Sequence, residues 1–136
     1  MKSIIDISFK RIFPNDIPRA CLPLVVANPK TKKSLNTYGI IDTGADECAF
    51  PPDIAKELRL KLKEGAPKVI NTGNGRSMAY SHKVSIDIQG CRLNNVIIDF
   101  LPNLHIPLIG VKSFLSKFIL IVDYPKKKFS LKAPKA

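Results

Sequence analysis

The chain has 136 residues, of which 45% are hydrophobic and 24% are charged. This length fits one domain with a real core, so we exclude a two-lobed enzyme that needs two full-sized halves of one chain. The composition also argues against general disorder. Lysine and arginine number 22 against 11 acidic residues, which gives a formal net charge of +11.

The spacing of apolar and turn residues predicts a mostly-β fold. Short apolar or alternating runs bounded by Asn, Pro and Gly are typical of strands joined by turns. The two strands expected between residues 69 and 89 flank a glycine-rich hairpin tip at residues 71–75. In chain order, strands are expected over residues 4–9, 20–28, 35–41, 69–89 as a pair, 93–101, 119–122 and 129–131.

Two short helices are expected between these strands. Pro51 and Pro52 predict the start of the first, because proline suits an opening helical turn. Apolar residues at 111, 114, 115 and 118 repeat with helical spacing and predict a second, amphipathic helix over residues 111–118. We expect residues 1–136 to form a single domain with its core at about 20–132, and residues 1–19 to form a terminal or interface strand.

The excess of basic residues suggests a nucleic-acid interpretation, because such a charge attracts polyanions in a salt-dependent way. Zinc-finger spacing, a basic strand interleaved with aromatic residues and a long basic helix are all missing from the sequence. We therefore interpret the basic clusters as solvated turns and a tail, and expect no nucleic-acid partner. The clusters are Lys30, Lys32 and Lys33; Lys56, Arg59, Lys61, Lys63 and Lys68; and Lys126, Lys127, Lys128, Lys132 and Lys135.

Cysteine usage indicates a reducing compartment. Cys21, Cys48 and Cys91 are widely spaced, odd in number and without a CxxC pair, so we expect buried free thiols and neither a metal site nor a cofactor. The first residues lack a signal-peptide apolar block, and no apolar stretch approaches the length of a membrane span. We expect a cytoplasmic protein without a membrane partner.

The informative segment is GIIDTGAD, from Gly39 to Asp46. An acid directly follows an aliphatic strand, and a hydroxyl residue and a glycine come next. Such a strand can hold the Asp42 carboxylate at the edge of a core. Gly44 permits a tight turn with close backbone approach, and Thr43 supplies a hydroxyl to fix the turn or a neighbouring chain. A purely structural Asp-Thr-Gly turn is the alternative.

The segment resembles the catalytic signature of retroviral-type aspartic proteases, the retropepsins, and their small bacterial relatives. The family motif stands here as Asp42-Thr43-Gly44-Ala45-Asp46. Downstream, Gly73-Asn74-Gly75 lies where the family carries a mobile flap, and Leu108-Ile109-Gly110 matches an aliphatic-aliphatic-Gly element before a short helix. The resemblance covers about residues 35–131 and implies a closed or orthogonal β-barrel-like acid protease fold, as a single lobe.

Two departures from the family pattern matter. Retroviral members usually follow the aliphatic-aliphatic-Gly element with an arginine that pairs with the acid in the position of Asp46, whereas this chain has Val111 and then Lys112. Asp46 therefore either pairs differently or is freer to meet substrate. The chain is also longer than the viral members, mostly before Asp42, so the dimer-forming termini could be arranged differently.

The resemblance implies an aspartic endopeptidase with a dyad of carboxylates. One Asp acts as general base on a water, while its protonated partner polarises the scissile carbonyl. The sequence contains a single Asp-Thr-Gly, so the second Asp42 must come from another copy in a symmetric homodimer. Thr43 would then lock the two loops together across the axis.

The resemblance also implies the residues that meet a peptide or protein substrate. Gly44, Asp46 and Glu47 would present partners to an extended peptide, and the tip Gly73-Asn74-Gly75 would close over it. Apolar substrate side chains would fill pockets near Ala45 and Leu108. Because Ala45 lacks the hydroxyl that a serine would direct towards the carboxylate, we expect a pH optimum nearer weakly acidic or neutral than strongly acidic.

The remaining acids and both histidines have structural interpretations. Asp53 is expected to start the helix, Asp87 and Asp99 to face solvent from alternating strands, and Asp123 to sit in a turn. His82 and His105 lack partner spacing for a metal or a nucleophile.

Two other functions compete with the endopeptidase. One is a non-catalytic dimeric peptide-binding module of the same fold, against which the intact Asp-Thr-Gly argues. The other is a basic nucleic-acid-associated domain, which the charge supports and the motif does not.

Overall fold

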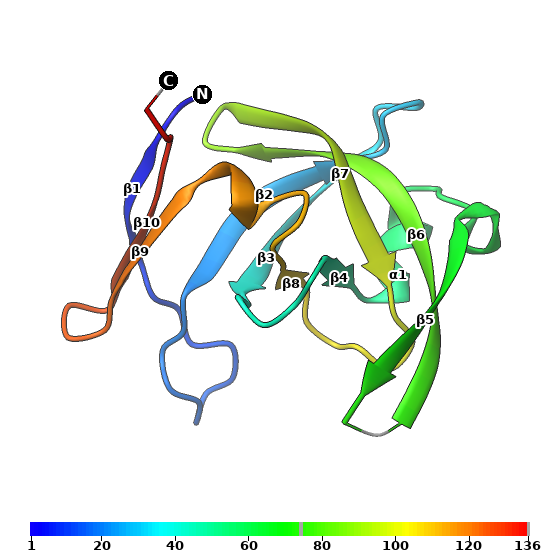
Figure 1. Ribbon diagram of the computed structural model, residues 1–136, viewed down its shortest axis with the longest axis horizontal. Helices are drawn as coiled ribbons and strands as arrows, with labels where there is room; N and C mark the ends of the chain where they lie inside the picture. The colour runs from blue at the N-terminus through cyan, green and yellow to red at the C-terminus, as the bar shows by residue number, and fades with distance from the viewer. Residues whose placement is uncertain (74, 136) are drawn as a thin grey trace.

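Ten strands form the framework of the computed structural model, which describes residues 1–73 and 75–135 (Figure 1). About half of the residues are in strands and 9% are in helices. The helical elements are α1 (Pro52–Glu57) and two 3-10 turns, η1 (Leu62–Glu64) and η2 (Leu115–Lys117). The strands are β1 (Ile4–Ser8), β2 (Cys21–Ala27), β3 (Ser34–Ile41), β4 (Cys48–Phe50), β5 (Ala66–Thr72), β6 (Gly75–Ile88), β7 (Cys91–Phe100), β8 (Leu108–Ile109), β9 (Ile119–Asp123) and β10 (Lys128–Lys132).

Six strands close into a barrel in the order β2-β3-β8-β4-β7-β6. The ring closes because β6 pairs with β2 as well as with β7, with Val26 opposite Ile86. Along β2, Leu22, Leu24 and Val26 are buried, because alternate side chains of a strand point to the same side. This barrel confirms the mostly-β, barrel-like fold that the sequence predicts.

The barrel interior is packed with aliphatic and aromatic side chains from several strands. Phe50 and Phe100 are fully buried and meet edge to face, with ring centroids 6.3 Å apart. Helix α1 and its C-cap residue pack against the core through Ile54, Ala55 and Leu58, which confirms the first predicted helix. Within the described ranges, no helix is long and apolar enough to cross a membrane.

The second predicted helix differs from the observed structure. Residues 111–114 form turns, and only η2 is helical. Phe114 has φ −128° and ψ −77°, outside the α region, so an α-helix cannot run through it. Phe114, Leu115 and Phe118 are nevertheless buried. The apolar spacing therefore identified the residues that face the core, but a tight turn satisfies that spacing as well as a helix does.

The hairpin β5–β6 extends beyond the barrel, at the lower right in Figure 1. Strand β5 pairs with β6, from Ala66 opposite Ser81 to Thr72 opposite Gly75. Val69 and Met78, which are paired across the hairpin, are both about half exposed. The hairpin agrees with the pair of strands predicted between residues 69 and 89.

A second sheet joins the two ends of the chain in the order β1-β10-β9, at the left in Figure 1. Ile4 and Ile7 of β1 are buried in the core, so this strand packs within its own chain. Residues 9–20 then lead to β2 as a loop in which Phe13 and Ile17 are exposed.

Candidate active site

Asp42 stands at the end of β3, where backbone hydrogen bonds hold the chain from both sides. The N–H of Ile41 donates to Ala20 O at 2.9 Å, and the N–H of Asp42 donates to Ile109 O at 2.9 Å. β8 runs parallel to β3, with Ile109 opposite Ile41. The carboxylate is therefore attached to a backbone that the barrel itself fixes.

The turn after Asp42 is stabilised by that residue's own side chain. The N–H of Gly44 donates to Asp42 Oδ1 at 3.0 Å, and the N–H of Ala45 donates to Asp42 O at 3.2 Å. This is the local bond by which an Asp favours a turn. A Cβ on Gly44 would come within 3.3 Å of Asp42 Oδ1, so glycine keeps that carboxylate face open. Asp42 is half-buried, whereas Thr43 and Gly44 are exposed.

The residues after β8 hold the other end of the same loop. The N–H of Val111 lies 3.0 Å from Ala45 O and 3.2 Å from Asp46 O, and the N–H of Lys112 donates to Asp46 O at 2.7 Å. A Cβ on Gly110 would collide with backbone atoms of Glu47 and Ala45. The Leu108-Ile109-Gly110 element is therefore close to the loop because its glycine has no side chain.

The position usually occupied by arginine works differently in this chain. Val111 contacts the Asp46 backbone instead of the Asp46 carboxylate. Asp46 is exposed, and within the described ranges its carboxylate forms no ion pair. Of the two alternatives open at this position, the structure agrees with an Asp46 carboxylate that has no basic partner among the described residues.

A cleft of about 460 Å³ opens between the Asp42 loop and strand β5. It brings together six of the residues expected at the site, whereas Thr43, Gly73 and Gly75 lie outside its lining and Asn74 lies outside the described residues. The expected residues are Asp42, Gly44, Ala45, Asp46, Glu47 and Leu108. The additional lining residues are Ala49, Lys68, Val69, Ile70, Asn71, Asp99 and Leu101.

The expectation that Asp99 faces solvent is wrong. Its exposed fraction is 3%, and it lies in the cleft opposite Ala49 of β4. Asp99 Oδ2 is 3.0 Å from Lys68 Nζ, and Asp99 Oδ1 accepts a 2.6 Å hydrogen bond from Ser81 Oγ. Alternation along β7 could not reveal this environment, because the polar partners come from β5 and β6. The sequence signal would have been a lysine and a serine on two neighbouring strands, at positions where both face one aspartate of a third strand.

The cysteines agree with their interpretation as buried free thiols, and His82 agrees with a structural role. All three thiols are free and buried. Burial raises the pKa of the Cys48 thiol to about 12, so the group stays neutral, and its sulfur accepts the N–H of Gly110 at 3.4 Å. His82 Nε2 is 2.9 Å from Leu62 O, and its ring packs on Phe100. Within the described ranges, no group of three or more His, Cys, Asp or Glu side chains could hold a metal ion.

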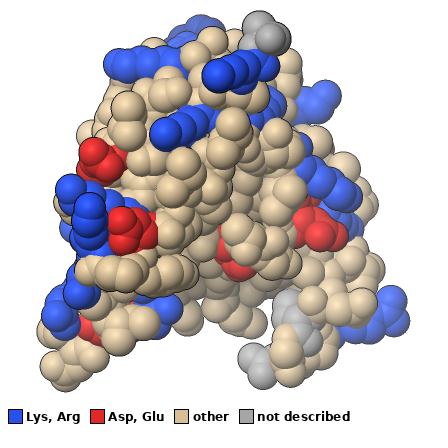
Figure 2. All heavy atoms as spheres, turned by 60° about the vertical axis from the view of Figure 1, so that its left-hand side comes forward, with Lys and Arg blue, Asp and Glu red and all other residues tan. Residues whose placement is uncertain are grey.

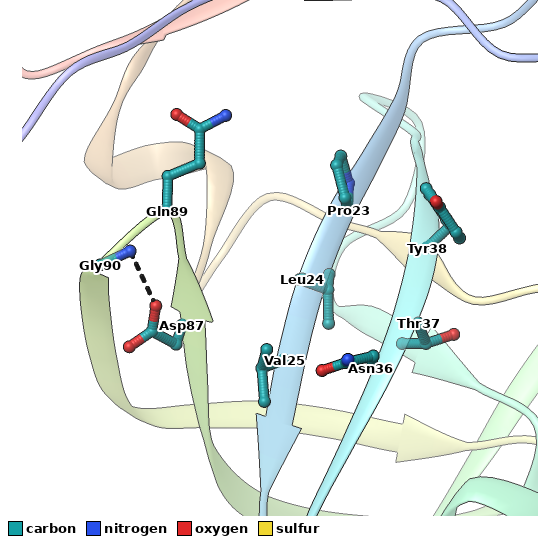
Figure 3. Close-up of a pocket in the computed structure, with 9 residues that line it drawn as sticks. All are labelled: Pro23, Leu24, Val25, Asn36, Thr37, Tyr38, Asp87, Gln89 and Gly90. Carbon is teal, nitrogen blue, oxygen red and sulfur yellow. Dashed lines mark hydrogen bonds between the residues drawn. The ribbon is translucent and has the colours of Figure 1, made fainter.

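A second hollow of about 480 Å³ lies outside the barrel, against β2, β3 and the β6–β7 turn (Figure 3). Its single carboxylate, Asp87, accepts the N–H of Gly90 at 3.0 Å and lies 3.9 Å from Arg92. No residue of the Asp-Thr-Gly loop lines this hollow. This hollow is therefore separate from the loop that the sequence motif identifies.

Basic residues are spread over the face drawn in Figure 2, and they do not gather in a single stripe. A basic stripe is the electrostatic footprint of a nucleic-acid-binding domain, and this face lacks one.

Comparison with known proteins agrees with this geometry. The sequence model of a family described as aspartyl protease matches residues 33–112, which is more than half of the chain. No curated protein matches the chain in sequence. A retropepsin-like aspartic protease from Rickettsia conorii has a similar structure, with a TM-score of 0.73 and 23% identity over 96% of this chain and 99% of that one. The EIAV protease, solved with the inhibitor HBY-793, has a TM-score of 0.54 and 16% identity over 73% of this chain and 88% of that one.

The closed barrel, with an Asp-Thr-Gly loop held beside β8, has the fold of a retropepsin-like lobe. The chain belongs to the aspartyl protease family. It is therefore a hydrolase of peptide bonds.

Proposed function

We propose that two copies of this chain assemble so that their Asp42 carboxyls form one catalytic dyad for endopeptidase cleavage. Two carboxylates about 3 Å apart cannot both be ionised, so the pair shares a proton. The ionised member takes a proton from a water, which attacks the scissile carbonyl. The protonated member donates a hydrogen bond to the carbonyl oxygen as negative charge develops there.

The observation that carries the proposal is the placement of Asp42. It is half-buried in the wall of a cleft, on a backbone held by β3 and β8, and the sequence has one Asp-Thr-Gly. A single fixed carboxylate can activate water but lacks the acid that polarises the carbonyl. Thr43 is exposed next to Asp42 and outside the cleft lining, which suits a contact with the second copy.

The substrate would lie as an extended strand between the Asp42 loop and the hairpin β5–β6. Ala45 and Leu108 would form apolar walls, while Gly44, Asp46 and Glu47 would offer polar contacts. The hairpin would act as the flap, with Gly73 and Gly75 at its tip. The exposed positions of Val69 and Met78 support this role, because a flap must present apolar surface to a bound peptide.

The whole chain, residues 1–136, would act as one domain with its main core over residues 20–132. Residues 1–19 would contribute to the contact between copies, because Phe13 and Ile17 are exposed on this segment. Three free buried thiols fit the reducing cytoplasm that the sequence predicts.

Cleavage of an unstructured polypeptide by wild-type protein and by Asp42→Asn tests the chemistry. We expect Asp42→Asn to lose about 10²–10⁴-fold or more in kcat, because the base and its shared proton disappear. Asp53→Asn is the matched control, since Asp53 is exposed on α1, outside the cleft, and should retain wild-type activity. Equal cleavage by wild type and Asp42→Asn would reject the dyad, and peptide binding without any cleavage would favour the non-catalytic module.

Mixed subunits test whether the dyad spans two chains. Wild-type and Asp42→Asn proteins are mixed in equal amounts and allowed to exchange. A shared dyad predicts about one quarter of the activity of wild-type protein at the same total concentration, because only pairs of two wild-type chains are active. Independent subunits predict about one half. Analytical ultracentrifugation that finds only monomer under cleaving conditions would also contradict the dimer.

The pH optimum stays a prediction based on Ala45. Its side chain offers no hydroxyl to the carboxylates, so we expect the rate to peak at weakly acidic or neutral pH. Ala45→Ser should move that peak towards lower pH. A wild-type profile that peaks near pH 2–3 would contradict this reasoning.

A further inference from the structure

The candidate cleft has a charge opposite to that of the whole chain. The formal net charge of the protein is +11, yet four of its 11 acidic residues line this cleft together with a single lysine. The acids are Asp42, Asp46, Glu47 and Asp99, and the lysine is Lys68. Because the negative charge is confined to the cleft, it affects which side chains the cleft binds more than how a substrate is attracted from a distance.

Lys68 does not neutralise the remaining acids of the cleft, because it is paired with Asp99. The two charged groups are 3.0 Å apart, and Ser81 Oγ donates to the other Asp99 oxygen. The Asp99 side chain is almost completely buried, and the Lys68 side chain is 41% exposed. The Lys68–Asp99 pair is therefore neutral as a unit, and it fixes the ammonium group at the base of β5.

Glu47 is left without a partner in the same part of the cleft. Its Oε1 atom has almost no exposed surface and, within the part of the chain that the structure describes, no hydrogen-bond donor. The residue forms no ion pair there either. A covered carboxylate oxygen without a donor is unfavourable and is rare in native structures. Such an atom indicates a donor that the described chain itself does not supply.

Four of the residues that line the cleft define what we call the Glu47 subsite: Glu47, Ala49, Lys68 and Asp99. Glu47 is the last residue before β4 and Ala49 lies within that strand, and both line the cleft. Ala49 pairs with Asp99 across β4 and β7. Val69 and Leu101 add apolar surface to the same lining.

We propose that the Glu47 subsite binds a lysine or arginine side chain of the peptide, so that the protease prefers substrates with a basic residue close to the scissile bond. This inference rests on the proposed function, because it assigns a preference to the same cleft. The aliphatic stem of the substrate residue would lie against Val69 and Leu101. Its cationic end would donate to Glu47, whose last torsion turns easily enough to present either oxygen.

Matched peptides test the preference. A peptide cleaved by the wild type is remade with lysine, norleucine or glutamate at each of three positions on either side of the scissile bond. We expect lysine to raise kcat/KM over norleucine by about tenfold at one position or more, the effect of a hydrogen bond to a charged group. The preference should weaken as salt is added. Norleucine as good as lysine at every position, or a preference for glutamate, would overturn the proposal.

Variants of Glu47 test whether this residue causes the preference for lysine. In Glu47→Gln the ratio of kcat/KM for lysine over norleucine peptides should fall to about one, whatever the overall rate, and Glu47→Lys should reverse the preference towards glutamate. Glu64→Gln is the matched control, because Glu64 is an exposed glutamate outside the cleft and should keep the lysine preference. A lysine preference that survives in Glu47→Gln would overturn the assignment. In that case the hydrogen-bond donor to Glu47 Oε1 would come from the second copy of the chain.

Binding separates this inference from the catalytic proposal. Fluorescence anisotropy measures the affinity of the Asp42→Asn protein for the same peptides without turnover. Tighter binding of lysine peptides through Glu47, with no cleavage by the wild type, would reject only the endopeptidase. Cleavage without a basic preference would reject only the Glu47 subsite, and so would equal binding of lysine and norleucine peptides.

Discussion

The Asp42 loop and the hairpin β5–β6 face each other across one cleft, but different forces hold them. Backbone hydrogen bonds fix the loop to β8 and to residues 110–112. The hairpin is joined to the barrel by the continuation of β6 and by side chains at its base, above all Lys68 with Asp99. The difference indicates that the wall carrying Asp42 is fixed by backbone bonds, whereas the hairpin wall depends more on side-chain contacts.

The largest expected effect comes from filling the space at Gly110. Gly110→Ala would push a methyl group against backbone atoms of Glu47 and Ala45. We expect it to lower the free energy of unfolding by about 1–3 kcal/mol or more, measured by urea unfolding at fixed protein concentration.

The matched change on the hairpin is Gly73→Ala, because a Cβ there meets nothing within 4 Å. We expect this variant to unfold within about 0.5 kcal/mol of wild type. Equal losses for the two glycines would remove the contrast between a fixed loop and an adaptable hairpin.

The Lys68–Asp99 pair should have the next largest effect. Asp99→Asn removes the charge that pairs with Lys68, and Lys68→Met removes the ammonium group. We expect each to cost about 1–3 kcal/mol, because each leaves a buried or half-buried polar partner unsatisfied. A double-mutant cycle measures the coupling.

The exposed pair Lys61–Glu64, 3.8 Å apart, serves as the control and should couple by about 0.5 kcal/mol or less. If Lys68 and Asp99 couple no more strongly than this pair, they do not anchor the hairpin.

The titration of the Cys48 thiol measures how tightly the wall that carries the Asp42 loop is packed. An ordinary thiol has a pKa of 9.0, but burial raises the pKa of folded Cys48 to about 12. Above pH 9 the unfolded chain loses the proton while the folded chain keeps it, so this contribution to stability is present below pH 9 and declines towards pH 12. The slope should approach about 1.4 kcal/mol per pH unit in that window.

Cys48→Ser lacks this ionisation and should give a flatter curve of unfolding free energy between pH 9 and 12. Native Cys48 should also resist iodoacetamide at pH 8, as followed by mass spectrometry of the modified peptide. Rapid native alkylation would mean that the thiol is accessible and the wall is loosely packed.

The smallest stability effect is expected on the outer part of the hairpin. Val69→Ser should change the free energy of unfolding by about 0.5 kcal/mol or less, because the side chain is half exposed. It should still raise KM for a peptide substrate, since Val69 lines the cleft. Ile121→Ser is the control, because Ile121 of β9 is similarly exposed but lies outside both the hairpin and the cleft lining, and its KM should be unchanged.

Local patterns predicted most of the strands, α1 and the Asp42 turn. Each depends on residues close in sequence, such as the Gly44 N–H that donates to Asp42 Oδ1. The strands β4 and β8 were missed, because three and two residues are too short to show a period and both form by pairing with distant strands. The helix predicted over residues 111–118 became a turn, because apolar spacing alone does not separate the two.

The sequence by itself determined the candidate for the reactive group, since the order Asp-Thr-Gly places one carboxylate after an aliphatic strand and a turn beside it. Only the tertiary structure decided what surrounds that carboxylate. Asp99 lies in the cleft because β7 runs between β4 and β6, and Lys68 reaches Asp99 because β5 folds back on β6. These contacts join residues about 30 positions apart, so they depend on how the barrel closes and not on any local pattern.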